Sequence, residues 1–332
     1  MHGQIEGQGQ RYHQVHVMIM PFDVKPHGVG VIGSGPFHQF VLERLSLRSD
    51  FAAIASWSDD DGVRSKSRLG DCAVHSSPQA VVDDPRTTVI YFASPTPPGL
   101  VELAIQSRKH VVLESGTAFQ FQDLRHLARM AANQGIVAVL DEPRRWDEDF
   151  VCAKSVFDSG CLGKLERLRL AIHECSLPGE VFPQGVLREL GCHWLDQLLV
   201  FVDDEPLAVH LKKFYDSVNA GENGFLAVMD FAGGTSAVVE VQTDSLLSLR
   251  TGWLLEGTTG AYRAGRLYTK TADGEIVDEP VNRSSVSSDP FFDALAAAID
   301  GDSKAQSALP GLDHAARVAE LMVRLEISHK VE

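Results

Sequence analysis

Eight residues in the middle of the chain combine side chains that can exchange protons. Residues 189–196 read ELGCHWLD, so Glu189 lies four residues before His193 and Asp196 three residues after it. On a helix these spacings put all three side chains on one face. A carboxylate beside an imidazole orients the ring and raises its pKa, as a general acid or base requires. We therefore predict a catalytic His193 assisted by Glu189 and Asp196; a buried, hydrogen-bonded structural histidine is the alternative.

A glycine-rich stretch near the start of the chain is typical of a phosphate-binding turn. The apolar run GVGVI (28–32) is followed by GSGPFH (33–38) and then by a helical pattern. Gly33 permits a tight turn, Gly35 lets the backbone approach a pyrophosphate, and the helix N-terminus offers amide donors. His38 replaces the third glycine of this fingerprint, and we expect its larger side chain to loosen the contact between helix and strand or to shift the loop. The residues predicted to bind a dinucleotide here are Gly33, Ser34, Gly35, Pro36 and Phe37.

Carboxylates follow the next apolar run, where a dinucleotide would place its adenosine ribose. The sequence there is SDDD (58–61), and we predict that Ser58 and Asp59 contact the cofactor. Carboxylates would repel a 2′-phosphate, which favours NAD over NADP. Arg64 and Lys66 act against this preference, and an acidic solvated turn is the alternative interpretation.

The run KHVVLES (109–115) ends in two polar residues, Glu114 and Ser115. Parallel strands deliver such residues to the ligand-binding edge of a sheet, so we predict that Glu114 lies near the cofactor and Ser115 near the substrate. Further along, Arg145 is a candidate substrate contact, although it and Arg144 fit a charged hinge between domains equally well.

The elements that must position these residues alternate between strands and helices. The clearest helix, FQDLRHLARMAANQG (121–135), has apolar residues at helical spacing and ends in glycine. Repeated strand–helix units predict a doubly wound parallel sheet. The predicted strands of this half are 28–32, 51–57, 88–94, 110–115 and 136–141.

The second half has a different pattern, with long strands close together and helices at the end. This pattern predicts an α+β domain, and the final segment 312–329 is amphipathic. We therefore divide the chain into an N-terminal extension (1–27), a Rossmann domain (28–146) and a substrate and oligomerisation domain (147–332). The predicted strands of the second domain are 165–174, 224–233, 235–244 and 246–257.

Composition excludes several classes of protein. A net charge of −15 without a basic stripe argues against nucleic acid as a partner, and no apolar run is long enough for a membrane helix. The five cysteines form no C-x-x-C pair, which favours a reducing cytoplasm over a disulfide framework. The extension lacks the features of a secretory signal, and its His2, His13 and His16 are expected to be solvated rather than to bind metal.

With these motifs in order, the chain resembles the Gfo/Idh/MocA oxidoreductase family, which includes glucose-fructose oxidoreductase and inositol dehydrogenase. The resemblance implies a Rossmann domain followed by a domain whose open, mostly antiparallel sheet forms a subunit interface, here in a homodimer or homotetramer. Besides the glycine turn, the resemblance rests on the stretches KHVVLE (109–114), 144–165, GCHWLDQLL (191–199), LEGTTGAY (255–262) and PFFDAL (290–295).

The resemblance also implies site residues, and three positions depart from the family pattern. Ser115 stands where the family has the lysine of a Glu-Lys-Pro motif, which assists proton movement, and Glu114 matches the glutamate. Glu189 and His193 match an Asp-x-x-x-His motif, with glutamate in place of aspartate. Ser94 and Pro95 match a cofactor-contacting Thr-Pro, but the histidine that follows in the family is missing.

Two functions follow from this comparison. The first is an NAD(P)-dependent oxidoreductase that transfers hydride to or from a sugar, cyclitol or related polyol, with His193 exchanging the proton. The second is a catalytically impaired sensor or partner protein that kept the fold and the ligand pocket. The neutral Ser115 favours the second, because a hydroxyl does not titrate near pH 7; the spacing of the residues around His193 favours the first.

Overall fold

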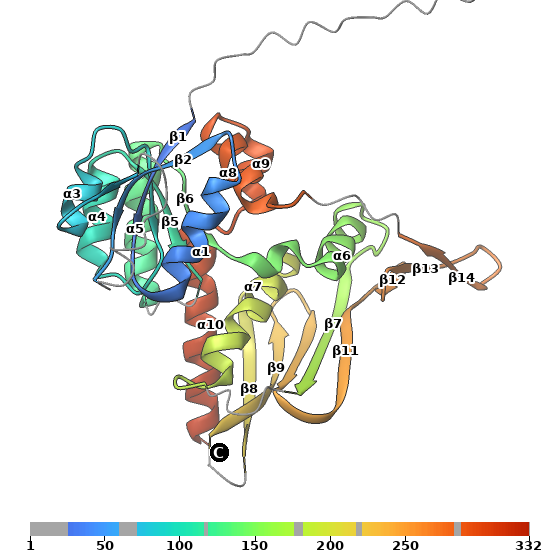
Figure 1. Cartoon of the computed structure of the whole chain (residues 1–332). Helices are drawn as coiled ribbons and strands as arrows, with labels where there is room; N and C mark the ends of the chain where they lie inside the picture. The colour runs from blue at the N-terminus through green and yellow to red at the C-terminus, as the bar shows by residue number, and fades with distance from the viewer. Residues whose placement is uncertain are drawn as a thin grey trace, which may run out of the picture.

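The computed structural model has two β-sheets, one from each half of the chain, with helices packed around them (Figure 1). It confirms the predicted class: a Rossmann doubly wound parallel sheet is followed by an α+β unit with an open, mostly antiparallel sheet. Apart from its last two residues, the predicted N-terminal extension, including His2, His13 and His16, lies outside the described residues. The structure describes residues 26–59, 72–115, 119–175, 182–216, 221–281 and 287–331.

The first sheet is parallel throughout and has the strand order β3-β2-β1-β4-β5-β6. Its central strands are buried apolar runs, as expected for a parallel sheet covered by helices on both faces. The chain order reverses between β1 and β4, where ligands of such sheets bind beyond the strand ends. The strands are β1 (His27–Ile32), β2 (Phe51–Trp57), β3 (Ala73–Val74), β4 (Val89–Phe92), β5 (His110–Glu114) and β6 (Ala138–Asp141).

In the described part of the chain, four helices connect these strands: α1 (Gly35–Ser46), α3 (Pro78–Val82), α4 (Pro98–Gln106) and α5 (Phe121–Gln134). The predicted pattern of α5 is confirmed, because its buried residues recur at helical spacing and Gly135 ends it with a φ of 65°. Among the described strands of this sheet, only the two-residue β3 was not predicted, because so short a strand shows no periodicity in the sequence.

The second sheet has the order β14-β13-β12-β11-β7-β10-β9-β8 and is antiparallel except for the β7–β10 pair. The edge strand β8 was not predicted, because Leu211 is its one fully buried residue and its apolar pattern is weak. The strands are β7 (Leu165–Cys175), β8 (Pro206–Tyr215), β9 (Glu222–Phe231), β10 (Ser236–Gln242), β11 (Asp244–Gly257), β12 (Gly260–Arg263), β13 (Arg266–Lys270) and β14 (Ile276–Pro280).

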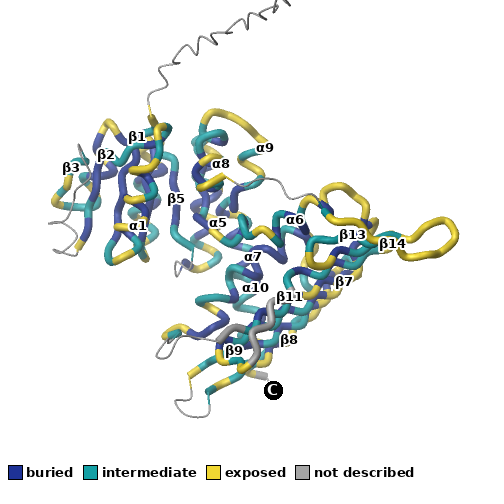
Figure 2. Tube along the Cα trace, turned by 45° about the vertical axis from the view of Figure 1, so that its right-hand side comes forward, coloured by how far each residue is buried: buried dark blue, intermediate teal, exposed yellow. Residues whose placement is uncertain are grey.

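Short helical segments link the two sheets and cover the second. A 3₁₀ turn and helix α6 follow β6, and a π-helical turn leads directly into α7, which packs on the sheet (Figure 1). Strands β13 and β14 project from the molecule, and β14 is exposed along its length (Figure 2). The helical segments are η1 (Pro143–Trp146), α6 (Glu148–Asp158), η2 (Leu187–Gly191) and α7 (Cys192–Phe201).

The last three helices, α8 (Pro290–Ile299), α9 (Ser303–Ala308) and α10 (Leu312–Val331), return to the first sheet. Phe291 and Phe292 of α8 join the buried cluster formed by β1, β4 and α1, and the start of α10 packs against α5. The long α10 then continues alongside α7 and β8 of the second unit (Figure 1). The predicted boundaries after residues 27 and 146 stay predictions, but the end of the chain completes the core of the Rossmann unit.

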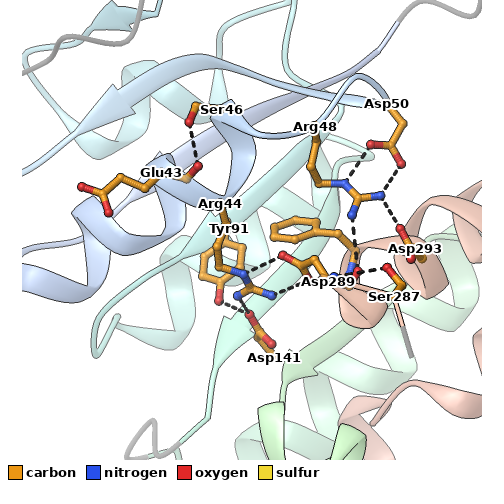
Figure 3. A network of polar contacts seen from close by, with 11 residues as sticks. Glu43, Arg44, Ser46, Arg48, Asp50, Tyr91, Asp141, Ser287, Asp289 and Asp293 are labelled. Carbon is orange, nitrogen blue, oxygen red and sulfur yellow. Dashed lines mark hydrogen bonds and ion pairs between the residues drawn. The ribbon is translucent and has the colours of Figure 1, made fainter. Parts of the chain in front are cut away.

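A polar network fastens α8 to the first sheet (Figure 3). Arg44 of α1 donates to both carboxylate oxygens of Asp289 at 2.9 Å and also pairs with Asp141 at the end of β6. The Tyr91 hydroxyl donates to the same Asp141 at 2.7 Å. Asp289 also caps α8 by accepting from the Phe292 amide. One guanidinium therefore joins α1, β6 and the C-terminal helices.

Candidate active site

The glycine turn after β1 has the geometry that a pyrophosphate requires. At Gly33 a side chain would approach the Ala93 carbonyl carbon to 2.9 Å, so the turn packs against the chain that follows β4 only if that residue is glycine. Gly35 has a φ of 69° and open space around it. Ser34 precedes α1 in an extended conformation, and within the described chain its side chain makes no capping hydrogen bond. Pro36 and Phe37 form the first turn of α1, so the turn, with its first amide donors, faces the ligand-binding edge.

His38 fits beneath α1 without displacing the helix. Its side chain is fully buried, and Nε2 lies 3.1 Å from the Ser56 hydroxyl on β2. Burial lowers the pKa of His38, which keeps the ring neutral. In place of the expected loosening of the helix–strand contact, a buried hydrogen bond joins α1 to β2.

Substituting Gly35 tests whether this turn binds the dinucleotide. Gly35→Val is expected to weaken NADH binding about 10- to 100-fold, because a β-branched residue strains the backbone at positive φ and shifts the turn. Gly274→Val is the matched control, since Gly274 also has positive φ (84°) and open surroundings but lies in the β13–β14 turn. Fluorescence titration with NADH measures both variants, and equal affinities for the two would contradict the assignment.

Other predicted cofactor residues lie at the same edge. Ser58 and Asp59 directly follow β2; Ser58 is buried and Asp59 is exposed. Ser94 and Pro95 follow β4 closely. Asp60, Asp61, Arg64 and Lys66, on which the choice between NAD and NADP also depended, lie outside the described residues.

Glu114 and Ser115 lie on opposite faces of the sheet. Glu114 ends β5 in register with Asp141 of β6. Burial, reinforced by the neighbouring Asp141 charge, raises the pKa of Glu114 to about 7. Ser115, the next residue, lines a cavity on the other face, as alternation along a strand requires.

His193 pairs with a carboxylate that was not predicted. Its Nδ1 lies 2.8 Å from both oxygens of Glu142, the residue after β6. Glu189, the predicted partner, instead accepts a hydrogen bond from the Gln184 amide at 2.6 Å. The reason is local: η2 is a π-helical turn, whose wider winding breaks the i, i+4 alignment assumed for an α-helix. The catalytic role of Glu189 stays a prediction.

The Glu142–His193 pair is nearly shielded from water, with side chains 4% and 16% exposed. Burial by itself lowers the pKa of His193, but the charge and hydrogen bond of Glu142 outweigh burial, so the pKa is raised overall. Because Glu142 engages Nδ1, Nε2 is the ring nitrogen that is left to exchange a proton with a ligand.

Asp196 lies close to this pair but has partners of its own. It accepts hydrogen bonds from Arg145 at 2.7 and 3.0 Å and forms an ion pair with His314 of α10 at 3.0 Å. Burial favours the neutral acid, yet the interactions with Arg145 and His314 lower the pKa of Asp196 to about 2. Arg145, predicted to contact substrate, is buried in this ion pair; its contact with a substrate stays a prediction.

A cavity of about 140 Å³, which we call the interdomain cavity, connects these residues. It lies between the edge of the first sheet, η2 and α7 on one side and α5 and α10 on the other. Ser115, Glu142, Cys192 and Asp196 line its polar end. Glu142 was not predicted from the sequence. It is nevertheless a polar residue directly after a parallel strand, as Ser115 is, and this feature led to the predictions for Glu114 and Ser115.

The parallel sheet with its glycine turn and the mixed second sheet define a class of fold, in which a Rossmann unit is followed by an α+β unit. Comparison with family models shows which family within this class. Residues 27–141 match the model described as "Oxidoreductase family, NAD-binding Rossmann fold", and residues 150–263 match the "GFO/IDH/MocA C-terminal domain". The chain belongs to the Gfo/Idh/MocA family.

Curated relatives are distant and match over part of their length. The myo-inositol 2-dehydrogenase of Thermotoga maritima is 24% identical over 52% of this chain and 51% of its own length. The scyllo-inositol 2-dehydrogenase (NADP(+)) IolW of Bacillus subtilis is 26% identical over 52% of this chain and 50% of its own. The chain spans about half the length of these relatives.

Solved structures share the fold over nearly the whole chain. UDP-N-acetylglucosamine 3-dehydrogenase GnnA from Acidithiobacillus ferrooxidans superimposes with a TM-score of 0.75 at 17% identity, covering 92% of this chain and 98% of that one. An NAD-binding protein from Listeria innocua gives 0.72 at 20% identity, covering 92% and 96%. No helix in the described part of the chain is long and apolar enough to cross a membrane.

Proposed function

We propose that the protein is an NAD(P)-dependent oxidoreductase that transfers hydride to or from a sugar, cyclitol or related polyol. The observation that supports it best is the Glu142–His193 pair, a buried imidazole with a raised pKa close to the edge where the glycine turn lies. The inositol dehydrogenases among the relatives agree with the substrate class. The exposed Asp59 after β2 favours NAD over NADP, because a carboxylate there repels a 2′-phosphate.

The cradle after β1 fits a dinucleotide, since open space surrounds Gly35 and the first amides of α1 face the ligand edge. The nicotinamide, when bound, accepts or returns the hydride. In the oxidation direction His193 takes the proton of the substrate hydroxyl at Nε2, while Glu142 holds the ring through Nδ1 and stabilises the imidazolium that forms. In the reduction direction the same imidazolium donates the proton.

Ser115 is the position at which this protein differs most from an ordinary family member. Its hydroxyl lines the interdomain cavity, where it can donate a hydrogen bond to a ligand but cannot supply a titrating proton. This substitution favours a second candidate, a sensor that binds dinucleotide and polyol with little or no turnover. We further propose a cytoplasmic homodimer or homotetramer joined through the second sheet.

Restoring the lysine separates the two candidates. Ser115→Lys is expected to raise turnover about tenfold or more, because it adds a second positioned acid–base group beside Glu142. Gln184→Lys is the control, since it adds the same charge to the same cavity away from the end of β5. Turnover is measured with polyols and aldoses in the presence of NAD or NADP. Tight dinucleotide binding without turnover in either variant would support the sensor.

A further inference from the structure

We propose that the alcohol accepted by this site carries an apolar aryl or alkyl group that packs against α5 and α10. This inference rests on the proposed function, because it places the reacting carbon at Ser115 and Glu142. It goes further by naming a substrate feature that a plain sugar or cyclitol lacks. The reason is the mixed chemistry of the interdomain cavity, whose lining combines polar side chains at the strand ends with a hydrocarbon surface from α5 and α10.

The apolar part of the lining comes from α5 and α10, two helices that pack against each other. Four residues of α10 at positions i, i+1, i+4 and i+5 and two residues of α5 contribute to it. Several of these side chains are only half-buried, so part of their hydrocarbon surface faces the cavity. The six residues are Phe121, Leu124, Val318, Ala319, Met322 and Val323.

Most charged groups near the cavity already have partners. Arg188 and Glu326 form a two-pronged ion pair at 2.7 and 2.6 Å, and Asp196 is held by Arg145 and His314. Ser115 and Glu142 are the polar groups of the lining that directly follow β5 and β6. A polyol with hydroxyls on every carbon would therefore press several of them against hydrocarbon, where each lost hydrogen bond is costly.

An apolar group, unlike a hydroxyl, binds favourably against hydrocarbon side chains. Cavities lined by Leu, Phe and similar residues stay dry and bind small apolar rings, because water finds too few polar partners in them. A substrate with a hydroxylated end and an aryl or alkyl end matches both the polar and the apolar side chains of the lining. Its hydroxyl lies at Ser115, and its apolar end covers Met322 and Phe121.

Benzyl alcohol is a suitable probe, since it joins one hydroxymethyl group to one apolar ring. The full-length protein is labelled at its methionine methyl groups and titrated by NMR with benzyl alcohol or with glycerol, which lacks the ring. We expect a saturable shift of the Met322 methyl signal with benzyl alcohol only. Met229, which is fully buried in the second unit, serves as an internal control and should not move. Met322→Leu assigns the signal.

A matched pair of valines tests the location. Val323→Thr keeps the side-chain shape but adds a hydroxyl to the apolar wall, and we expect benzyl alcohol to bind about 5-fold or more weakly. Val277→Thr, on the exposed strand β14, makes the same change far from the cavity and should have no effect. Circular dichroism confirms that both variants fold.

The inference is overturned if benzyl alcohol produces no saturable Met322 shift, if glycerol produces the same shift, or if both threonine variants bind like wild type. NADH affinity and turnover are measured on the same preparation. Intact NADH binding and turnover without a benzyl alcohol shift would refute the inference alone. A benzyl alcohol shift without any dinucleotide binding would refute the proposed function instead.

Discussion

Replacing His193 with alanine is expected to lower turnover about 10²- to 10⁴-fold and to leave NADH affinity unchanged, the range expected for one positioned acid–base group. In the proposed mechanism the His193 ring exchanges the substrate proton, whereas the dinucleotide is proposed to bind at the glycine turn after β1, in a different part of the chain. Steady-state kinetics and fluorescence titration measure the two quantities separately. Turnover that does not depend on His193 would show that another group is the base.

The Glu142→Gln variant tests whether the carboxylate acts through His193. Oxidation needs the neutral imidazole, so its rate rises as pH increases through the His193 pKa, and the reduction rate falls over the same interval. Glu142 is what raises that pKa. Without its charge, burial dominates and lowers the pKa, so both limbs of the pH profile should move to lower pH. A lower rate with unmoved limbs would mean that Glu142 has only a structural role.

Replacing Arg44 with methionine is expected to lower the free energy of unfolding by about 3–5 kcal/mol, the cost of leaving a buried charge without its partner. The Arg44 guanidinium pairs with Asp141, whose side chain is 2% exposed (Figure 3). It also lies 4.7 Å from the centre of the Phe292 ring. Losing it loosens α8 from the first sheet. Urea denaturation measures the change.

Arg48→Met is the matched control. Arg48 pairs with Asp50 and Asp293, whose side chains are 36% and 46% exposed, so its loss should cost about 1 kcal/mol or less.

Without Arg44, burial holds the folded-state pKa of Asp141 above its unfolded value. The folded Arg44→Met variant therefore favours protonated Asp141, and its deficit should grow as pH rises through that pKa. Equal losses in the two variants, or a deficit independent of pH, would contradict this account.

Local sequence patterns were enough for the elements whose faces differ strongly in polarity. The apolar runs of the parallel sheet and the periodic face of α5 are such cases, because burial on both faces or along one stripe leaves a regular spacing. The edge strand β8 exposes half of its residues and fully buries only Leu211, so it shows no regular apolar spacing. The glycine turn was also predictable, since Gly33 packs closely against the Ala93 backbone and Gly35 adopts a positive φ, and both conditions favour glycine.

The site was predictable only in part. The sequence by itself determined the family, the two-sheet architecture, and the strand ends and helix from which polar side chains must come, His193 among them. Only the tertiary structure decided that Glu142 rather than Glu189 contacts His193, and that Asp196 and Arg145 neutralise each other. The pairing of Glu142 with His193 joins residues 51 positions apart. Such pairing depends on how one sheet edge meets a helix of the other unit and on the π-helical turn that rotates that helix, and neither leaves a periodic signal in the chain.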